Sequence, residues 1–509
     1  MTLQKLLDDT AFRFPGKDAV VQGRTRLTFG DLLERAGRVT SRLAADYAPG
    51  SRVAVIASNI PEFVELYFGL AASGLVAVPV NFRLTASEIA YILQDADVSA
   101  VIFTANLEPQ LTEALGDSDL SPDLVRIGDP ARDSILLPAQ AYNDWLASAA
   151  LEFPGPDGRD AFLIAYTSGT TGRPKGALIS QNGLIEAVRL QQNHYGGLNA
   201  HDRLLTVMPL FHINAAMFAV ACVAAGATNI VQPSGDGTGH NIICTVKQHG
   251  ITILSVVPTI LREMLAAVRE DDRVRPTTLR ALLCGSAPLD YADKQAVHEV
   301  LGAELYEIYG ATELSIVTVL QPKDVLERPG SVGRVVPGKE LQLRDGGGNV
   351  TTEGEIWSRG QGTLLVEYWN RPEATREARD DDGWVSVGDL ARVDEEGYVY
   401  LLDRKNDLII SGGENVYPQE VEAALQHYPG VESVAVVAAP DEKWGERVHA
   451  VLVMAPDCIA PTVDELRAFT ADTLARYKQP RSVEVWPRLP QTATGKIQRR
   501  KVRDRLHQS

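Results

Sequence analysis

The stretch Tyr166-Thr-Ser-Gly-Thr-Thr-Gly-Arg-Pro-Lys-Gly176 follows an apolar run at 161–165 and consists mainly of small hydroxyl residues and glycines. Consecutive Ser, Thr and Gly residues allow backbone N–H groups and hydroxyls to converge on one point, which suits a phosphate group. Lys175 adds a compact positive charge to the same loop. A flexible surface loop is the alternative interpretation, but so many donors directly behind a buried strand favour a phosphate-binding loop.

The loop differs from the common nucleotide-binding pattern G-x-x-x-x-G-K-[ST], in which the last hydroxyl binds Mg²⁺. Counted from Gly169, the second glycine position is Pro174 and the hydroxyl position is Gly176. Pro174 has no N–H to donate, and Gly176 has no side-chain oxygen. The sequence therefore predicts that this loop holds phosphate in another way and that the metal ligand comes from elsewhere in the chain.

The composition is that of a globular protein with more than one unit. A chain of 509 residues exceeds one hydrophobic core, and 45% hydrophobic with 23% charged residues is ordinary. The net charge of −17 argues against general binding to nucleic acids or anionic membranes. Neither a signal peptide nor a clean apolar run of about 20 residues is evident, so we expect a cytoplasmic protein. The cysteines lack metal-ligand spacing and are predicted to be reduced thiols: Cys222, Cys244, Cys284 and Cys458.

Apolar strand patterns alternate with helical patterns as far as residue 308, which predicts layered α/β sheets covered on both faces. Residues 104–160 show no clear pattern. After residue 331 the strands alternate between apolar and polar residues, which predicts a small antiparallel, β-barrel-like part. We expect a large N-terminal domain at 1–403 and a small mobile α+β domain at 404–509. In the small domain, Thr462 and Glu465 form a capping-box pattern ahead of a helix predicted at 464–476.

Two further motifs follow predicted strands, where α/β sheets bind ligands. Tyr309-Gly-Ala-Thr-Glu313 offers an aromatic ring for a base and a carboxylate that can bind Mg²⁺. Gly388-Asp389 offers a carboxylate suited to two ribose hydroxyls. Taken alone, a capped strand end explains Tyr309–Glu313 about as well as ligand binding does, and a turn explains Asp389 better than ribose binding does.

Several motifs occur in one order and together resemble the adenylate-forming superfamily of acyl-CoA synthetases, luciferases and peptide-synthetase adenylation domains. They are the loop at 166–176, Pro209–His212, Cys284–Leu289, Tyr309–Glu313, Gly388-Asp389, Asp403–Gly413 and Thr494–Lys496. The resemblance covers essentially the whole chain and implies two half-reactions. A carboxylate attacks the α-phosphate of ATP, giving acyl-adenylate and pyrophosphate, and a thiol, usually that of coenzyme A, then displaces AMP. The implied co-substrates are ATP with Mg²⁺ and coenzyme A.

The resemblance also assigns residues to the nucleotide and to catalysis. Lys496 matches the family's catalytic lysine, whose positive charge offsets the repulsion between the carboxylate and the α-phosphate. Glu313 is the implied metal ligand. The implied catalytic set is Lys496, Thr312, Glu313 and His212. The implied ATP- and AMP-binding set is Thr167, Ser168, Gly169, Thr170, Thr171, Gly172, Lys175, Ser286, Ala287, Tyr309, Asp389 and Arg404.

The implied acid pocket is mostly small or apolar, so we expect an uncharged aliphatic or aryl acyl group of moderate size. Its lining is Ile213, Asn214, Ser255, Cys284, Ile308, Gly310, Ser315 and Ile316, with His212 as an aromatic gate. Arg189 on the preceding helix is a candidate partner for a second acidic group on the substrate. Alternatively, the Arg189 side chain faces solvent, which is more common for arginine.

The resemblance places coenzyme A against Gly412, Gly413, Trp444 and Tyr477, and a domain hinge at Asn406, where the family commonly has Asp or Lys. Gln479 stands where some aryl-CoA ligases have a basic residue. The expected function is therefore an AMP-forming acid–thiol ligase that makes acyl-CoA. An adenylating ligase that uses a carrier-protein thiol or a nitrogen nucleophile is the alternative. The oligomeric state stays open, with a homodimer as one candidate.

Overall fold

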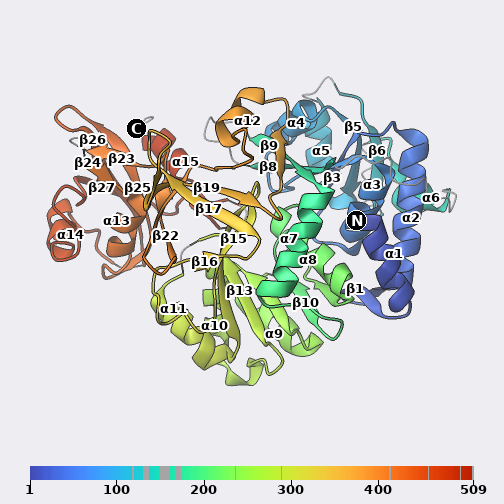
Figure 1. The fold of residues 1–509 in the computed structure, drawn as a ribbon, viewed down its shortest axis with the longest axis horizontal. Helices are drawn as coiled ribbons and strands as arrows, with labels where there is room; N and C mark the ends of the chain where they lie inside the picture. The colour runs from blue at the N-terminus through green and yellow to red at the C-terminus, as the bar shows by residue number, and fades with distance from the viewer. Residues whose placement is uncertain are drawn as a thin grey trace. The chain divides into compact units, whose positions relative to one another are not determined.

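The structure is a computed structural model that describes residues 1–116, 120–129, 137–148, 161–167, 174–235, 237–287, 289–411, 414–456, 458–492 and 495–506. The chain forms two compact units (Figure 1). Unit 1 consists of Met1–Leu341 with Ser358–Val385, and unit 2 consists of Gln342–Trp357 with Ser386–Ser509. The mixed α/β fold expected from the sequence is confirmed. The domain boundary expected at residue 403 falls inside unit 2. A mobile domain at 404–509 stays a prediction.

A nine-stranded sheet in unit 1 is parallel at its centre and antiparallel at both edges. Its central strands are rich in Val, Ile and Leu and are buried, as expected for strands covered on both faces. In spatial order, its strands are β16 (Arg334–Val335), β15 (Ser315–Leu320), β14 (Glu304–Ala311), β13 (Ala281–Gly285), β12 (Ile253–Val256), β10 (Arg203–Thr206), β11 (Thr228–Val231), β1 (Asp18–Gln22) and β2 (Thr25–Thr28).

An eight-stranded sheet in unit 1 carries the phosphate-loop motif. Strands β8 and β9 flank the loop and pair antiparallel, and β20 pairs antiparallel with β9 at the sheet edge. In spatial order, its strands are β20 (Leu365–Tyr368), β9 (Lys175–Ser180), β8 (Ala161–Thr167), β4 (Val76–Pro79), β3 (Arg52–Ile56), β5 (Val98–Thr104), β6 (Asp123–Ile127) and β7 (Gln140–Ala141).

Helices α7 (Gln181–His194) and α8 (Ile213–Ala225) lie between the two sheets (Figure 1). Helix α7 contacts β9, and α8 contacts α7, β10 and β11. Because α8 is apolar on nearly every side, it suits this buried position. The other helices of unit 1 are α1 (Leu3–Arg13), α2 (Phe29–Asp46), α3 (Pro61–Ser73), α4 (Ala86–Asp95), α5 (Glu108–Gly116), α6 (Tyr142–Ala147), α9 (Gly239–His249), α10 (Pro258–Glu270), α11 (Tyr291–Ala296) and α12 (Pro372–Ala378).

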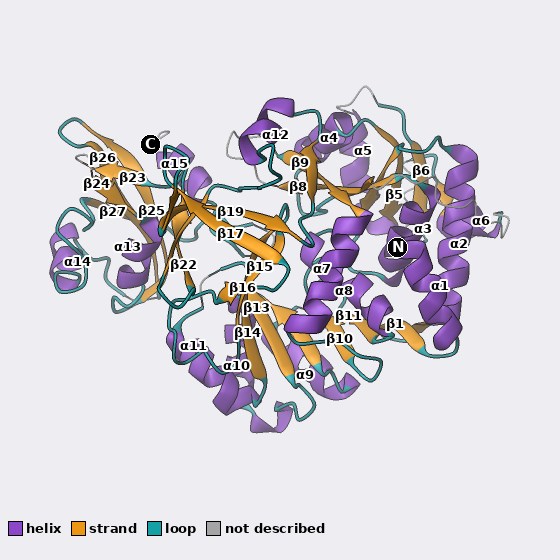
Figure 2. Cartoon of the chain, viewed as in Figure 1, coloured by secondary structure: helices purple, strands orange, loops and turns teal. Residues whose placement is uncertain are grey.

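Unit 2 contains a second kind of architecture, in which antiparallel strands predominate (Figure 2). One five-stranded sheet has the order β18 (Val350–Thr351), β17 (Lys339–Arg344), β19 (Glu353–Gly360), β21 (Asp389–Val393) and β22 (Val399–Arg404), and β17 and β19 cross the division between the units. The last sheet contains β24 (Glu414–Val416), β23 (Ile409–Ser411), β26 (Gly445–Met454), β25 (Val431–Asp441) and β27 (Ser482–Val485).

The last sheet is buried on both faces. Val434 and Val436 of β25 belong to one hydrophobic cluster, and the alternate residues Ala435 and Val437 belong to another. The helices of this part are α13 (Pro418–Leu425), α14 (Val463–Phe469) and α15 (Arg499–Leu506).

Most elements predicted from the sequence occur with small shifts in their ends, but two predictions need correction. The capping box of Thr462 and Glu465 is present, yet the predicted helix 464–476 ends at Phe469. Thr470 is the C-cap, with a φ of −95° and a ψ of 5° outside the helical region, and its hydroxyl donates to the Leu466 carbonyl, a local bond that weakens a helix. Within 104–160, where no pattern was evident, α5, β6, β7 and α6 form. Among the residues described, no helix has both the length and the apolarity to cross a bilayer.

Candidate functional site

The phosphate-loop motif connects two antiparallel strands, unlike a strand–loop–helix nucleotide loop. Thr167 at the end of β8 is paired in register with Lys175 at the start of β9. The Thr167 hydroxyl reaches the Lys175 carbonyl oxygen at 3.5 Å. The other predicted loop residues lie outside the described residues: Ser168, Gly169, Thr170, Thr171 and Gly172.

The predicted metal carboxylate lies in the turn between β14 and β15. Glu313 is only 6% exposed, and Thr312 beside it is half-buried. The turn requires Gly310, because a Cβ there would lie 2.1 Å from the Ser315 carbonyl oxygen. Ser315 itself has a φ of 56°, and its hydroxyl donates to the Gly362 carbonyl at 2.7 Å. Backbone geometry and a side-chain hydrogen bond therefore fix the turn that carries Glu313.

Tyr368 connects this turn to the phosphate loop, and the sequence analysis did not identify it. Its hydroxyl donates to Glu313 Oε1 at 2.7 Å. Lys175 Nζ lies 5.5 Å from the centroid of the same ring. Lys175 and Tyr368 come from the paired strands β9 and β20, whereas Glu313 comes from the β14–β15 turn of the other sheet, so only the tertiary structure brings the three together. No spacing rule links Glu367-Tyr-Trp-Asn370 to either motif.

The predicted adenine-binding residues lie on β14 and directly after the neighbouring strand β13. Gly285 at the end of β13 is paired with Ile308 of β14, and a Cβ on Gly285 would lie 2.6 Å from the Ile308 carbonyl oxygen. Tyr309 is buried, whereas Ser286 and Ala287 are exposed. Ser286 has a φ of 71°, so the chain turns sharply after the strand. The structure thus gives an exposed loop next to a buried tyrosine.

The predicted gate His212 is the N-cap of α8. Its Nδ1 accepts a hydrogen bond from Asn214 N–H at 3.3 Å, so this nitrogen carries no proton. The residue keeps part of its surface exposed, but its ring is surrounded by protein, and this desolvation lowers the pKa of His212. At neutral pH the gate is therefore a neutral imidazole.

The structure places the predicted acid-pocket residues on two different faces of the nine-stranded sheet. Ser255 is in register with Leu283, and Gly285, two residues further on, is in register with Ile308, so Ser255 and Ile308 share a face. Cys284 is in register with Glu307 and therefore lies on the opposite face. There Cys284 adjoins a buried ion pair, in which Lys294 Nζ lies 2.5 Å from Glu307 Oε2.

The remaining predicted pocket residues come from two elements. Ile213 and Asn214 start α8, whereas Ser315 and Ile316 start β15 opposite Ala311 and Gly310. Within the described part of the chain, Asn214 Oδ1 is buried and has no hydrogen-bond donor. Arg189 is exposed on α7, and its guanidinium contacts Met1 Sδ at 3.3 Å, so the structure favours the solvent-facing alternative.

Three predicted residues gather in unit 2. Asp389 and Arg404 are paired in register on β21 and β22, with Arg404 Nε 3.2 Å from Asp389 Oδ1. The pKa of Lys496 is lowered to about 8, first by desolvation and then by repulsion from Arg404, while Asp389 opposes the shift. Lys496 as a whole residue is exposed.

The predicted hinge residue Asn406 lies between Asp403 and Asp407 in the sequence, and both of these aspartates form ion pairs. Arg499 Nη1 is 2.9 Å from Asp403 Oδ1 and 3.5 Å from Asp407 Oδ2. Arg503 pairs with Asp407 and donates to the Asn406 carbonyl oxygen at 3.2 Å. Both arginines belong to α15, so the hinge segment and the C-terminal helix form one charged network.

The predicted coenzyme A residues Trp444 and Tyr477 are both half-buried in unit 2. Lys443 and Arg481 lie 4.8 and 4.7 Å from the Trp444 ring centroid. Gln479 is buried and donates to backbone carbonyls, so the cations beside Trp444 come from other positions. Gly412 and Gly413 lie outside the described residues.

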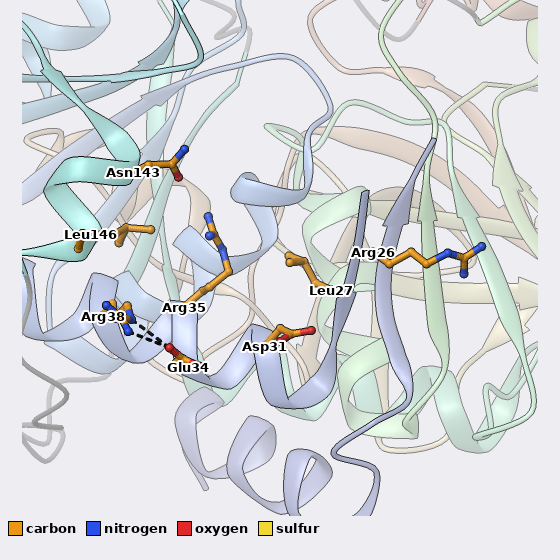
Figure 3. A pocket seen from close by; sticks show the side chains of 9 residues that line it. Arg26, Leu27, Asp31, Glu34, Arg35, Arg38, Asn143 and Leu146 are labelled. Atoms are coloured by element: carbon orange, nitrogen blue, oxygen red, sulfur yellow. Dashed lines mark hydrogen bonds and ion pairs between the residues drawn. The ribbon is translucent and has the colours of Figure 1, made fainter. Parts of the chain in front are cut away.

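A hollow of about 470 Å³ in unit 1 contains none of the predicted site residues. Figure 3 shows its charged side chains, and Arg38 is paired there with Glu34 at 2.9 Å. Arg35 is held at 2.9 Å by the buried carboxylate of Glu65. The lining is Arg26, Leu27, Asp31, Glu34, Arg35, Arg38, Asn143, Leu146 and Ala147. Because none of the predicted pocket residues lines it, the hollow is not the predicted acid site.

Comparison with known proteins gives consistent results over the whole chain. The family model for AMP-binding enzymes matches residues 7–369, and that for the AMP-binding enzyme C-terminal domain matches 420–496. A feruloyl-CoA synthase of Amycolatopsis is 37% identical, with 97% of this chain and 96% of that protein covered. A long-chain-fatty-acid–CoA ligase of Mycobacterium tuberculosis is 34% identical, with 95% and 94% covered.

A crystal structure of the anthranilate CoA ligase AuaEII in complex with anthranoyl-AMP has a TM-score of 0.89 and 27% identity, covering 100% of this chain and 98% of that one. Fold, motif order and sequence similarity agree. The chain therefore belongs to the AMP-binding enzyme family, the adenylate-forming superfamily that its motifs resemble.

Proposed function

We propose that this protein is an ATP- and Mg²⁺-dependent carboxylate–CoA ligase that works through an acyl-adenylate. The observation that carries the proposal is the contact chain from Lys175 through Tyr368 to Glu313. It joins a cation at the phosphate loop to a buried carboxylate, the two charges needed to hold a metal-bound polyphosphate. The relatives named as CoA ligases support the same reaction type.

The donor set at this site suits Mg²⁺, which usually binds proteins through one or two carboxylates and keeps its other ligands from phosphates and water. Glu313 and the Thr312 hydroxyl would be the protein groups near the metal. When bound, Mg²⁺ supplies positive charge that offsets the charge on the phosphates. Lys175 and its loop then hold the departing pyrophosphate, while Asp389 and Arg404 bind the ribose.

Lys496 is proposed to bring the acid to the α-phosphate. The attacking carboxylate and the phosphate are both anionic, so a lysine between them stabilises the transition state more than either reactant. The lowered pKa of Lys496, about 8, still leaves most of the ammonium charged at pH 7. Deprotonation above pH 8 should therefore weaken adenylation.

The acid is proposed to be a carboxylic acid whose aliphatic or aryl acyl group carries no charge of its own. Ile213, Ile308 and Ile316 are buried apolar side chains, and the exposed Arg189 offers no second cation. Coenzyme A is the proposed acceptor. The nucleotide end of coenzyme A carries phosphates, and the two cations beside Trp444, Lys443 and Arg481, could bind them. Mg²⁺ dependence, a cytoplasmic location and a homodimer remain predictions.

The test is ATP–pyrophosphate exchange across short, medium and long fatty acids, benzoates, cinnamates and dicarboxylates, followed by CoA addition with the best acid. We expect exchange with a monocarboxylic acid and CoA-dependent release of AMP. Lys496→Ala should lower exchange by about 10²–10³-fold while sparing thioester formation from pre-made acyl-adenylate. Exchange without CoA-dependent AMP release would point instead to a carrier-protein thiol or a nitrogen nucleophile. No exchange with any acid would refute the proposal.

A further inference from the structure

Strand β20 and the residue before it hold Glu313 at both its backbone and its side chain. The N–H groups of Leu364 and Leu365 each donate to the Glu313 carbonyl oxygen at 2.9 Å. Tyr368, at the far end of the strand, donates its hydroxyl to the carboxylate at 2.7 Å. A hydrogen bond to a carboxylate is among the stronger ones in proteins, and its geometry is correspondingly defined. One short segment therefore fixes both where Glu313 lies and where its carboxylate points.

Both partners of this hydrogen bond are shielded from water. Tyr368 is 8% exposed and Glu313 is 6% exposed. A buried carboxylate needs donors to replace its lost hydration, so removing the Tyr368 hydroxyl leaves one Glu313 oxygen without that donor. Loss of the hydroxyl should therefore weaken the binding of a ligand to the Glu313 carboxylate.

The same strand is hydrogen-bonded to the strand that begins with Lys175. Tyr368 is in register with Ala177 of β9, and Trp369 N–H donates to the Gly176 carbonyl at 2.7 Å. Lys175 Nζ, 5.5 Å from the Tyr368 ring centroid, is within the range of a cation–π contact. Tyr368 thus uses its hydroxyl for the carboxylate and its ring for the lysine.

We propose that Tyr368 is a positioning residue that sets the Glu313 carboxylate for Mg²⁺ and orients Lys175 toward the phosphates of the same nucleotide. This inference rests on the proposed function, because it assumes that Glu313 serves the metal. The two contacts of Tyr368 are separable, since phenylalanine keeps the ring and loses only the hydroxyl.

The test measures nucleotide binding directly, by titration calorimetry of ATP into the full chain at a series of Mg²⁺ concentrations and in EDTA. In Tyr368→Phe, the Mg²⁺ concentration that gives half-maximal enhancement of ATP binding should rise about tenfold, the loss expected for one charge-assisted hydrogen bond. The affinity for ATP in EDTA should change less than twofold, because the ring still faces Lys175.

Tyr142→Phe is the matched control. Tyr142 is also buried and donates to a buried carboxylate, Glu65 Oε1, at 2.6 Å, but neither residue belongs to the predicted site. This variant should match the wild type in both affinities. A double-mutant cycle with Glu313→Gln keeps the test decisive if Tyr368→Phe lowers stability, because the effect on Mg²⁺ dependence should vanish when the carboxylate is absent.

The outcomes separate the two proposals. Equal Mg²⁺ dependence in the wild type and Tyr368→Phe, or an effect that persists in the Glu313→Gln background, would overturn the role of Tyr368. Failure of the wild type to bind ATP more tightly with Mg²⁺ would instead contradict the metal site in the proposed function.

Discussion

At the scale of single residues, Lys339 has no counterpart in the sequence motifs, yet it lies beneath the turn that carries Glu313. It is 7% exposed, and its ammonium donates to the Leu314 carbonyl at 2.5 Å and reaches Thr363 Oγ1 at 3.5 Å. Burial lowers the pKa of Lys339 to about 7, and the carboxylate of Glu186 on α7 opposes the shift. A charged ammonium here is thus costly at neutral pH.

The lowered pKa of Lys339 predicts a pH-dependent stability of defined sign. Between pH 7 and 10.5 the unfolded chain binds a proton that the folded chain does not, so the folded state gains stability as pH rises through that window. From pH 7 to 9 the gain should be about 2 kcal/mol, and Lys339→Met should remove it. Urea midpoints of both proteins at the two pH values give the measurement. An unchanged pH dependence in Lys339→Met would contradict the assignment.

At the scale of elements, Arg499 binds α15 to the segment that contains the predicted hinge. Its side chain is 12% exposed and pairs with Asp403 at 2.9 Å and with Glu422 at 2.5 Å. Asp403 has a fully buried side chain, and desolvation raises its pKa to about 6, opposed chiefly by attraction to Arg499. Helix α15 follows Lys496 within three residues, so this network also anchors the chain next to the proposed catalytic lysine.

Loss of this arginine should be far more costly than loss of a neighbouring exposed one. Arg499→Gln leaves buried carboxylates without their partner and should destabilise the protein by about 3–5 kcal/mol. Arg500→Gln on the same helix breaks an exposed pair with Asp504 at 3.6 Å, and should cost less than about 0.5 kcal/mol. Thermal melts of both variants provide the comparison. Similar losses of stability in the two variants would contradict the prediction that the buried ion pairs of Arg499 matter more.

At the scale of the whole molecule, Asn59 ties the two large sheets of unit 1 together near the predicted acid gate. It follows β3 in one sheet, and its amide donates to the Met208 carbonyl at 3.1 Å and accepts from Leu210 N–H at 2.8 Å after β10 in the other. Tyr67 donates to the Leu210 carbonyl at 2.6 Å from the same side. These bonds fix the loop that leads into His212.

Asn59→Asp should therefore act mainly on the acid. The carboxylate can still accept from Leu210 N–H but cannot donate to the Met208 carbonyl, which would face a negative oxygen. The KM for the acid should rise about tenfold, as for a lost buried hydrogen bond, with the KM for ATP changed less than threefold. Tyr67→Phe, which loses only the bond to Leu210, should shift the same constant less. Equal changes for acid and ATP would mean that Asn59 has only a general structural role.

The sequence by itself predicted the α/β fold, most strands and helices, and the family. The alternation of apolar strand and helix patterns predicted the layered sheets, and Thr462 with Glu465 caps α14 as their spacing predicts. Local motifs also predicted the phosphate loop and the metal ligand Glu313, because phosphate and metal chemistry requires particular residue types at short spacing, and both assignments remain predictions. The assignment of Lys496 came from motif order and remains a prediction.

Only the tertiary structure could decide which distant residues meet. Strand register placed Cys284 on the face opposite Ser255 and Ile308, a distinction that one residue of shift would reverse. Pairing of β20 with β9 brought Tyr368 to Lys175, and the β14–β15 turn brought Glu313 to Tyr368. The physical reason is that periodicity and short motifs report local conformation, whereas hydrogen bonds between separate strands depend on the sheet order that the whole chain adopts.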